Sequence, residues 1–144
     1  MFYREELSFL REVFHRRRIR TALVYRDEFF NLLSKEREEI EFRFHTPLPL
    51  SMPELLPKTV YKTIDAFAFC HCFFLLPDTD KPTVFYIGPY LAEPLSHQQQ
   101  WLLGEKNGIS PQKQRYLSEY YEGTPILAPD GALATMLSTF CERL

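Results

Sequence analysis

Cys70, His71 and Cys72 are the closest grouping of residues that could do chemistry, since thiolate and imidazole are both good zinc ligands. They lie in an apolar run that predicts a strand over 67–76. Successive side chains of a strand point to opposite faces, so both cysteines face one side and the histidine the other. No second cysteine pair follows, and Cys141 is far away in sequence. We therefore expect core packing and no metal site.

Other catalytic signatures are missing from the sequence. There is no G-x-S-x-G, no P-loop and no G-x-G-x-x-G motif, and five glycines leave little material for a loop around phosphate. A nucleophilic pair of Cys141 with a distant histidine has nothing to support it. We expect His71 to hydrogen-bond to a neighbour, as buried polar groups do. The sequence therefore predicts no enzyme and no cofactor.

A ligand pocket is the alternative chemistry that the centre of the chain favours. Small residues share one face of the predicted strand, tyrosine hydroxyls lie nearby, and a glycine ends the next strand, which together suit an apolar pocket with a few polar points. The competing interpretation is that helices fill the space. The predicted ligand-binding residues are Tyr61, Cys70, Cys72, Tyr86, Gly88 and Tyr90.

Three strands with short connections must position these residues. Alternating and apolar runs predict strands over 59–64, 67–76 and 83–87, and the turn-rich segment between the last two favours an antiparallel meander. The second and third strands are apolar on both faces, so the sheet should be covered on both sides.

Helices surround this meander in the prediction. Apolar spacing predicts a first helix over 2–17, followed by a strand over 19–25. Residues 27–39 fit a helix capped by Asp27, and Ile40, Phe42 and Phe44 then alternate as in a half-buried strand. Four prolines between 46 and 57 predict an irregular loop. The fold class is α+β, an antiparallel meander flanked by helices and similar to PAS and GAF domains.

Capping signals predict three helices in the last third of the chain. Ser96 begins one that ends near 107, Ser110 and Pro111 begin a second that ends at Gly123, and Asp130 begins the last. The last helix carries an apolar stripe, and no Gly, Asn or Pro closes it. We interpret that stripe as a dimerisation or linker surface made of Leu133, Leu137, Phe140 and Leu144.

Composition limits the class of protein and its surroundings. The 144 residues are 45% hydrophobic and 15% aromatic, which suits one folded domain and excludes disorder. Three cysteines, acids near the N-terminus and no apolar run of membrane-spanning length favour the cytoplasm and no membrane. The formal charge of −2 argues against nucleic acid binding by this chain. The basic cluster Arg16–Arg18 fits the negative end of a helix.

The run Asp78-Thr79-Asp80-Lys81-Pro82-Thr83-Val84-Phe85-Tyr86-Ile87-Gly88-Pro89-Tyr90 carries a resemblance to a known family. Together with Leu55–Leu76 and the tail through Arg143, it resembles the N-terminal regulatory domain of AraC-type transcriptional regulators from Firmicutes. In that family a similar domain precedes two helix-turn-helix units that bind DNA. The resemblance covers residues 55–144 best and fixes no effector.

The resemblance implies a sensory and dimerising module. We expect a single regulatory domain over residues 1–144, with a DNA-binding domain beyond 144, so that DNA is a partner through that second domain. A homodimer and an unidentified small-molecule effector are the other expected partners. The alternative is a pure oligomerisation or scaffold module with no small-molecule ligand, whose exposed stripe lies on the first or last helix.

Overall fold

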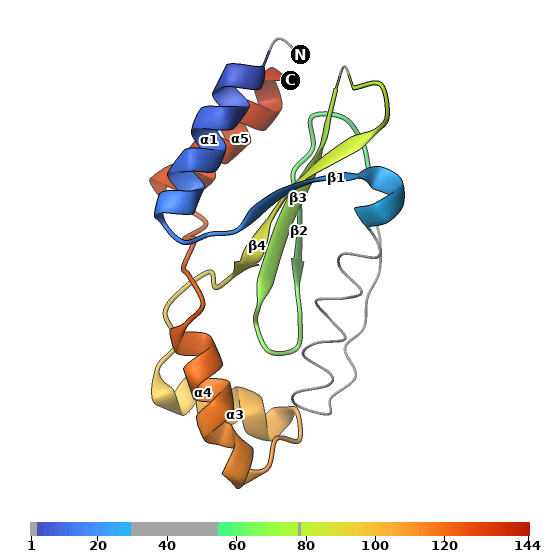
Figure 1. Ribbon diagram of the computed structural model, residues 1–144. Helices are drawn as coiled ribbons and strands as arrows, with labels where there is room; N and C mark the ends of the chain where they lie inside the picture. The colour runs from blue at the N-terminus through green and yellow to red at the C-terminus, as the bar shows by residue number, and fades with distance from the viewer. Residues whose placement is uncertain (1–2, 30–54, 78) are drawn as a thin grey trace.

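The computed structural model describes residues 3–29, 55–77 and 79–144. These form an α+β fold in which a four-stranded antiparallel sheet packs against helices (Figure 1). The strands are β1 (Thr21–Tyr25), β2 (Tyr61–Ile64), β3 (Cys70–Leu76) and β4 (Thr83–Tyr90). The helices are α1 (Arg4–Arg16), α3 (His97–Lys106), α4 (Gln114–Glu122), which follows a 3-10 turn (Pro111–Lys113), and α5 (Ala132–Arg143).

The sheet has the strand order β1-β4-β3-β2. The three successive strands β2, β3 and β4 pair antiparallel with their neighbours, which confirms the predicted meander. The first strand joins the free edge of β4, with Thr21 opposite Ile87 and Tyr25 opposite Thr83. This long-range pairing completes the sheet and makes β1 and β2 its two edges.

Each of the four strands differs from the prediction at one end, and β1 and β2 begin two residues later than predicted. The strand predicted over 67–76 begins at Cys70, because residues 65–69 form a turn. In that turn the Asp65 carboxylate accepts hydrogen bonds from the backbone N–H of Phe67 (2.9 Å) and of Phe69 (3.0 Å). The strand predicted over 83–87 continues to Tyr90. Register shifts where Cys72 pairs with Ile87 and Cys70 with Tyr90, so β4 carries one extra residue there.

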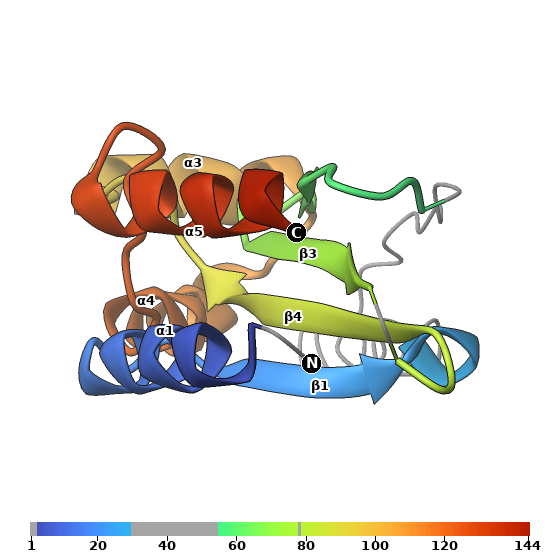
Figure 2. The ribbon, with the colours of Figure 1, turned by 90° about the horizontal axis from the view of Figure 1, so that it is seen from above.

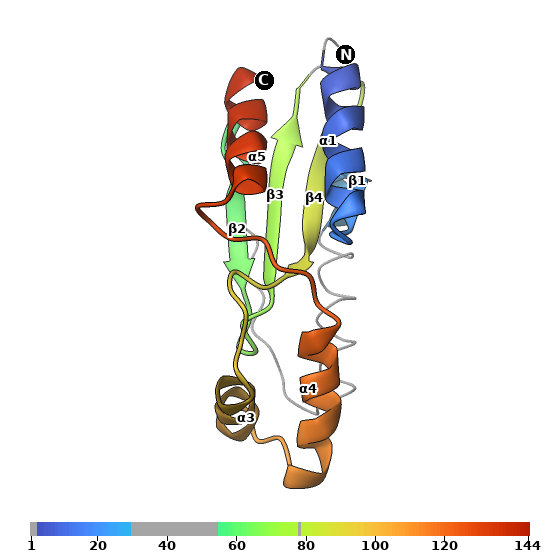
Figure 3. The same ribbon diagram turned by 90° about the vertical axis from the view of Figure 1, so that its left-hand side faces the viewer.

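The two terminal helices lie side by side on one face of the sheet (Figures 2 and 3). Their apolar residues meet those of β3 and β4 in the main core, where Phe14, Phe74 and Phe85 are fully buried. Tyr3 and Phe140 join the two helices edge to face, with ring centroids 6.2 Å apart. Burial of this apolar surface is the main force that holds the helices to the sheet.

The opposite face of the sheet is also apolar. Phe29, Phe73, Val84 and Tyr86 form a second buried group there. The rings of Phe29 and Phe73 lie 4.6 Å apart. Because β3 and β4 bury residues on both faces, the expectation that both sides of this sheet are covered is confirmed.

Helices α3 and α4 form a separate pair beyond the end of the sheet (Figure 1). Ser96 caps α3 as predicted, in a capping box with Gln99. Ser110 and Pro111 begin the next element as predicted, although its first turn is a 3-10 helix and the Ser110 side chain makes no capping bond. The predicted cap of α5, Asp130, is wrong by one residue, because Gly131 occupies that position.

The helix predicted after β1 is supported at its start, because residues 26–29 are helical. The predicted strand at Ile40, Phe42 and Phe44 lies outside the described residues. So does most of the predicted proline-rich loop.

Candidate functional site

Three of the six predicted ligand-binding residues meet at one cavity. Cys70, Cys72 and Tyr90 line a hollow of about 200 Å³ between the sheet and α5, which we call the α5 cavity. Leu137 of α5 closes it from the opposite side. Its other described walls come from β2 and the residue before it, from the segment after β4, from the connector before α5 and from α5 itself: Val60, Lys62, Thr63, Ile64, Ala92, Leu127, Pro129, Ala134 and Ser138.

The other three predicted residues lie elsewhere. Tyr61 stacks on Phe73, with ring centroids 5.8 Å apart, on the opposite face of the sheet. Tyr86 belongs to the same opposite face, and Gly88 lies against the backbone and ring of His71. For Tyr86 the physical reason is the extra residue of β4, which reverses the alternation between Tyr86 and Tyr90. Tyr61 pairs with Phe73 in the register of β2 and β3 and shares its face. The six residues therefore do not form one pocket.

The α5 cavity suits binding better than covalent chemistry. Burial raises the pKa of the Cys72 thiol to about 12 and raises the pKa of the Cys70 thiol and of the Tyr90 hydroxyl. A thiol attacks as its thiolate, and these groups stay protonated at neutral pH. All three described cysteines are free and buried. The cavity offers apolar walls and weak polar points to a small molecule.

His71 and Tyr86 form a buried polar pair on the opposite face. The Nδ1 atom of His71 and the Tyr86 hydroxyl are 2.6 Å apart, which confirms the expected hydrogen bond of His71. Burial, with a smaller effect of Arg20, lowers the pKa of His71 to about 4. Burial likewise raises the pKa of Tyr86. Both groups are therefore neutral near pH 7.

The lack of a side chain at Gly88 leaves space for the His71 ring of this pair. Its φ of +143° lies in a region that side chains rarely adopt. A Cβ atom at this position would lie 3.0 Å from the Cys70 carbonyl oxygen and 3.3 Å from Nδ1 of His71. The predicted role of Gly88 as a pocket residue is thus replaced by close backbone packing.

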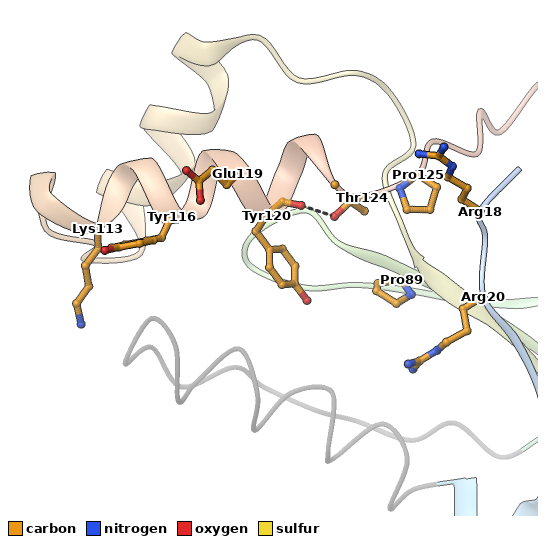
Figure 4. Close-up of a pocket in the computed structure, with 10 residues that line it drawn as sticks. Arg18, Arg20, Pro89, Lys113, Tyr116, Glu119, Tyr120, Thr124 and Pro125 are labelled. Carbon is orange, nitrogen blue, oxygen red and sulfur yellow. Dashed lines mark hydrogen bonds between the residues drawn. The ribbon is translucent and has the colours of Figure 1, made fainter.

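A larger hollow of about 720 Å³ lies between α4 and the connection from α1 to β1 (Figure 4). We call it the arginine–tyrosine pocket. Its described lining consists of Arg18, Arg20, Pro89, Lys113, Tyr116, Glu119, Tyr120, Gly123, Thr124 and Pro125. In the sequence, the only sign of this pocket was the basic cluster at residues 16–18. That cluster was interpreted as basic residues that complement the negative end of α1.

The apolar stripe of α5 faces mainly inward. Leu137 and Phe140 are buried in the main core, and Leu133 and Leu144 are partly buried against it. The expectation of an exposed stripe on this helix is therefore wrong, because the sheet of the same chain offers an apolar face to these side chains. The linker role of α5 stays a prediction.

Comparisons with protein-family models, with curated proteins and with solved structures return no match. Across the described residues, no helix is both long and apolar enough to cross a bilayer. Within the same part of the chain, no three metal-ligating side chains gather at one point.

Proposed function

We propose that this chain is a ligand-sensing regulatory domain, PAS- or GAF-like in architecture. More specifically, we propose that it serves a bacterial AraC-type transcriptional regulator, senses a small-molecule effector in the cytoplasm and forms a homodimer. Contact with DNA would then belong to helix-turn-helix units that follow residue 144. The resemblance of residues 55–144 to that family is the sequence argument for this proposal.

The observation that carries the sensing role is the position of the α5 cavity. Cys70, Cys72 and Tyr90 form its wall on the sheet, and Leu137 forms its wall on α5. A molecule bound there would contact both β3 and α5. A ligand shifts an equilibrium between two arrangements by its difference in affinity for them. The last helix is thus the element through which occupancy of the cavity would reach a following domain.

The dimer of this proposal needs a surface other than the α5 stripe. The groove between the exposed sides of α1 and α5 is such a surface, with Phe9 60% exposed beside Met136. The scaffold alternative requires a filled core, whereas the α5 cavity leaves about 200 Å³ open. That observation favours sensing.

A cavity-filling variant and its matched control test the sensing role. Thermal-shift screening of a library of small bacterial metabolites, confirmed by calorimetry, should find a compound that stabilises the chain. Ala134→Leu fills the cavity and should abolish that binding. Ala132→Leu adds the same atoms at an exposed position of the same helix and should leave binding intact. A library without a binder, or a binder unaffected by Ala134→Leu, would refute sensing through this cavity.

The family assignment has its own test. The coding DNA beyond codon 144 should encode two helix-turn-helix patterns. Sedimentation of the chain should give a dimer, and Phe9→Glu should convert it to a monomer. Coding DNA without such patterns contradicts the regulator, and a wild-type monomer contradicts the dimer.

A further inference from the structure

The arginine–tyrosine pocket is built differently from the α5 cavity and has its own chemistry. Its volume of about 720 Å³ is in the range of small-molecule sites. Arg18 and Arg20 flank Pro89 and Pro125 at one end, and Tyr116 and Lys113 lie at the other, with Tyr120 between them (Figure 4). Cationic groups and an aromatic wall thus share one hollow.

The charge of the described lining is positive. Arg18, Arg20 and Lys113 contribute three cations, and Glu119 contributes one carboxylate. The Glu119 carboxylate bonds to Nε of Arg115, outside the lining, at a distance of 3.3 Å. The described lining thus places guanidinium groups at one end of the hollow, and guanidinium groups match carboxylate and phosphate oxygens in geometry.

The aromatic wall is held in place by packing. Tyr116 and Tyr120 are one helical turn apart on α4, so they lie on the same side of that helix. The Tyr120 ring packs edge to face on the fully buried Phe69, with centroids 4.9 Å apart. Tyr116 is 65% exposed and offers its ring to a ligand. An apolar body of a ligand can lie against both rings.

The backbone of Arg18, at the arginine end of the pocket, has an unusual conformation. Arg18 has a φ of +61°, in the left-handed region that ordinarily requires glycine after a helix. The N–H of Arg18 donates to the His15 carbonyl (2.9 Å) and the N–H of Ile19 to that of Phe14 (3.0 Å), which is the Schellman pattern. An arginine at this position costs stability that glycine would spare. Strained residues of this kind gather at functional sites.

From these observations we propose that the arginine–tyrosine pocket binds an organic anion. The ligand carries a carboxylate or phosphate group at the arginine end and an apolar or aromatic body along Tyr116 and Tyr120. This binding goes beyond the sensing role assigned to the α5 cavity and does not depend on it. The described linings of the two hollows have no residue in common, although the neighbouring residues Pro89 and Tyr90 line one each.

Calorimetry and NMR titration with three probes test the proposal. The probes are 3-phenylpropionate, phenyl phosphate and the neutral 3-phenylpropan-1-ol, in a buffer free of phosphate. At least one anionic probe should bind with a dissociation constant in the millimolar range or below, and the neutral probe at least about tenfold more weakly. The tighter of the two anions identifies the acidic group. If neither binds, or if the alcohol binds equally well, the proposal fails.

Variants at the two left-handed residues separate function from structure. Arg18→Gly should raise the melting temperature and weaken the binding of the anion by at least about tenfold. Lys58→Gly is the matched control, because Lys58 also has positive φ (+55°), lies outside the described lining and loses the same charge. It should raise the melting temperature and leave affinity unchanged. Arg20→Gln should weaken binding as Arg18→Gly does. Equal affinity in wild type, Arg18→Gly and Arg20→Gln would overturn the proposed site.

Discussion

Asp65→Asn should change the pH dependence of stability in a direction that the structure fixes. Burial raises the pKa of the Asp65 carboxyl from its ordinary 3.8 to about 6, against the opposing effect of the two backbone N–H donors of the turn. Native Asp65 therefore binds a proton more readily than unfolded Asp65 between about pH 4 and 6. Its contribution to the free energy of unfolding is largest at low pH and falls by about 3 kcal/mol as pH rises through this window.

His71 acts in the opposite direction over nearly the same window. Burial lowers its pKa from 6.5 to about 4, so the unfolded chain binds this proton more readily than the native one. The contribution of His71 is present above about pH 6.5 and is lost, by about 3 kcal/mol, as pH falls to about 4. The two contributions nearly cancel in the wild type. We expect the pair to add little net pH dependence between pH 4 and 6.

Urea unfolding, followed by circular dichroism at pH values from 4 to 7, measures the pH dependence of the free energy of unfolding. An asparagine oxygen can accept the same two backbone hydrogen bonds, so Asp65→Asn keeps the turn and removes the titration. The difference between the curves isolates Asp65, since other acids contribute to both proteins. The variant's free energy of unfolding should gain about 3 kcal/mol relative to wild type between pH 4 and 7. His71→Gln should deviate with the opposite sign. Parallel curves for wild type and Asp65→Asn would refute the reasoning.

Four further variants test packing and helix capping by chemical denaturation. Gly88→Ala should cost about 1–3 kcal/mol, since φ is +143° and Cβ would approach the Cys70 oxygen to 3.0 Å; an unchanged midpoint contradicts this. Ser96→Ala should cost about 1 kcal/mol, whereas Ser110→Ala, which removes no capping bond, should cost almost nothing; equal losses would refute the assignment of the caps. Leu137→Ala should cost about 2–5 kcal/mol and enlarge the α5 cavity, and a loss below about 1 kcal/mol would show that the core closes around it.

Local patterns predicted the meander and its helices because each signal is contained in a short stretch of sequence. The turn residues between β3 and β4 and the Ser96 cap are examples. The pairing of β1 with β4 could not be predicted in this way, because several strand orders satisfy the same apolar pattern. The packing of α5 against the sheet could not be predicted either, because an apolar helical stripe does not indicate which surface it packs against.

The candidate site was predicted in part for a related reason. Cys70 and Cys72 are two residues apart on β3, so the period of a strand predicted that they share one face. Tyr86 and Tyr90 were expected to line one pocket, and the extra residue in β4 places them on different faces. Arg18 was noticed for its charge, while its left-handed backbone became visible only with coordinates.

The pairing of β1 with β4 sets an order of events during synthesis. The ribosome releases residues 21–25 long before residues 83–90 exist, at about 5–20 residues per second, so β1 waits several seconds for its partner. During that time its backbone is unpaired and Leu23 and Val24 face water or a chaperone. Contacts so distant in sequence slow folding and favour aggregation. Slower translation between β1 and β4 should therefore lower the yield of folded chain.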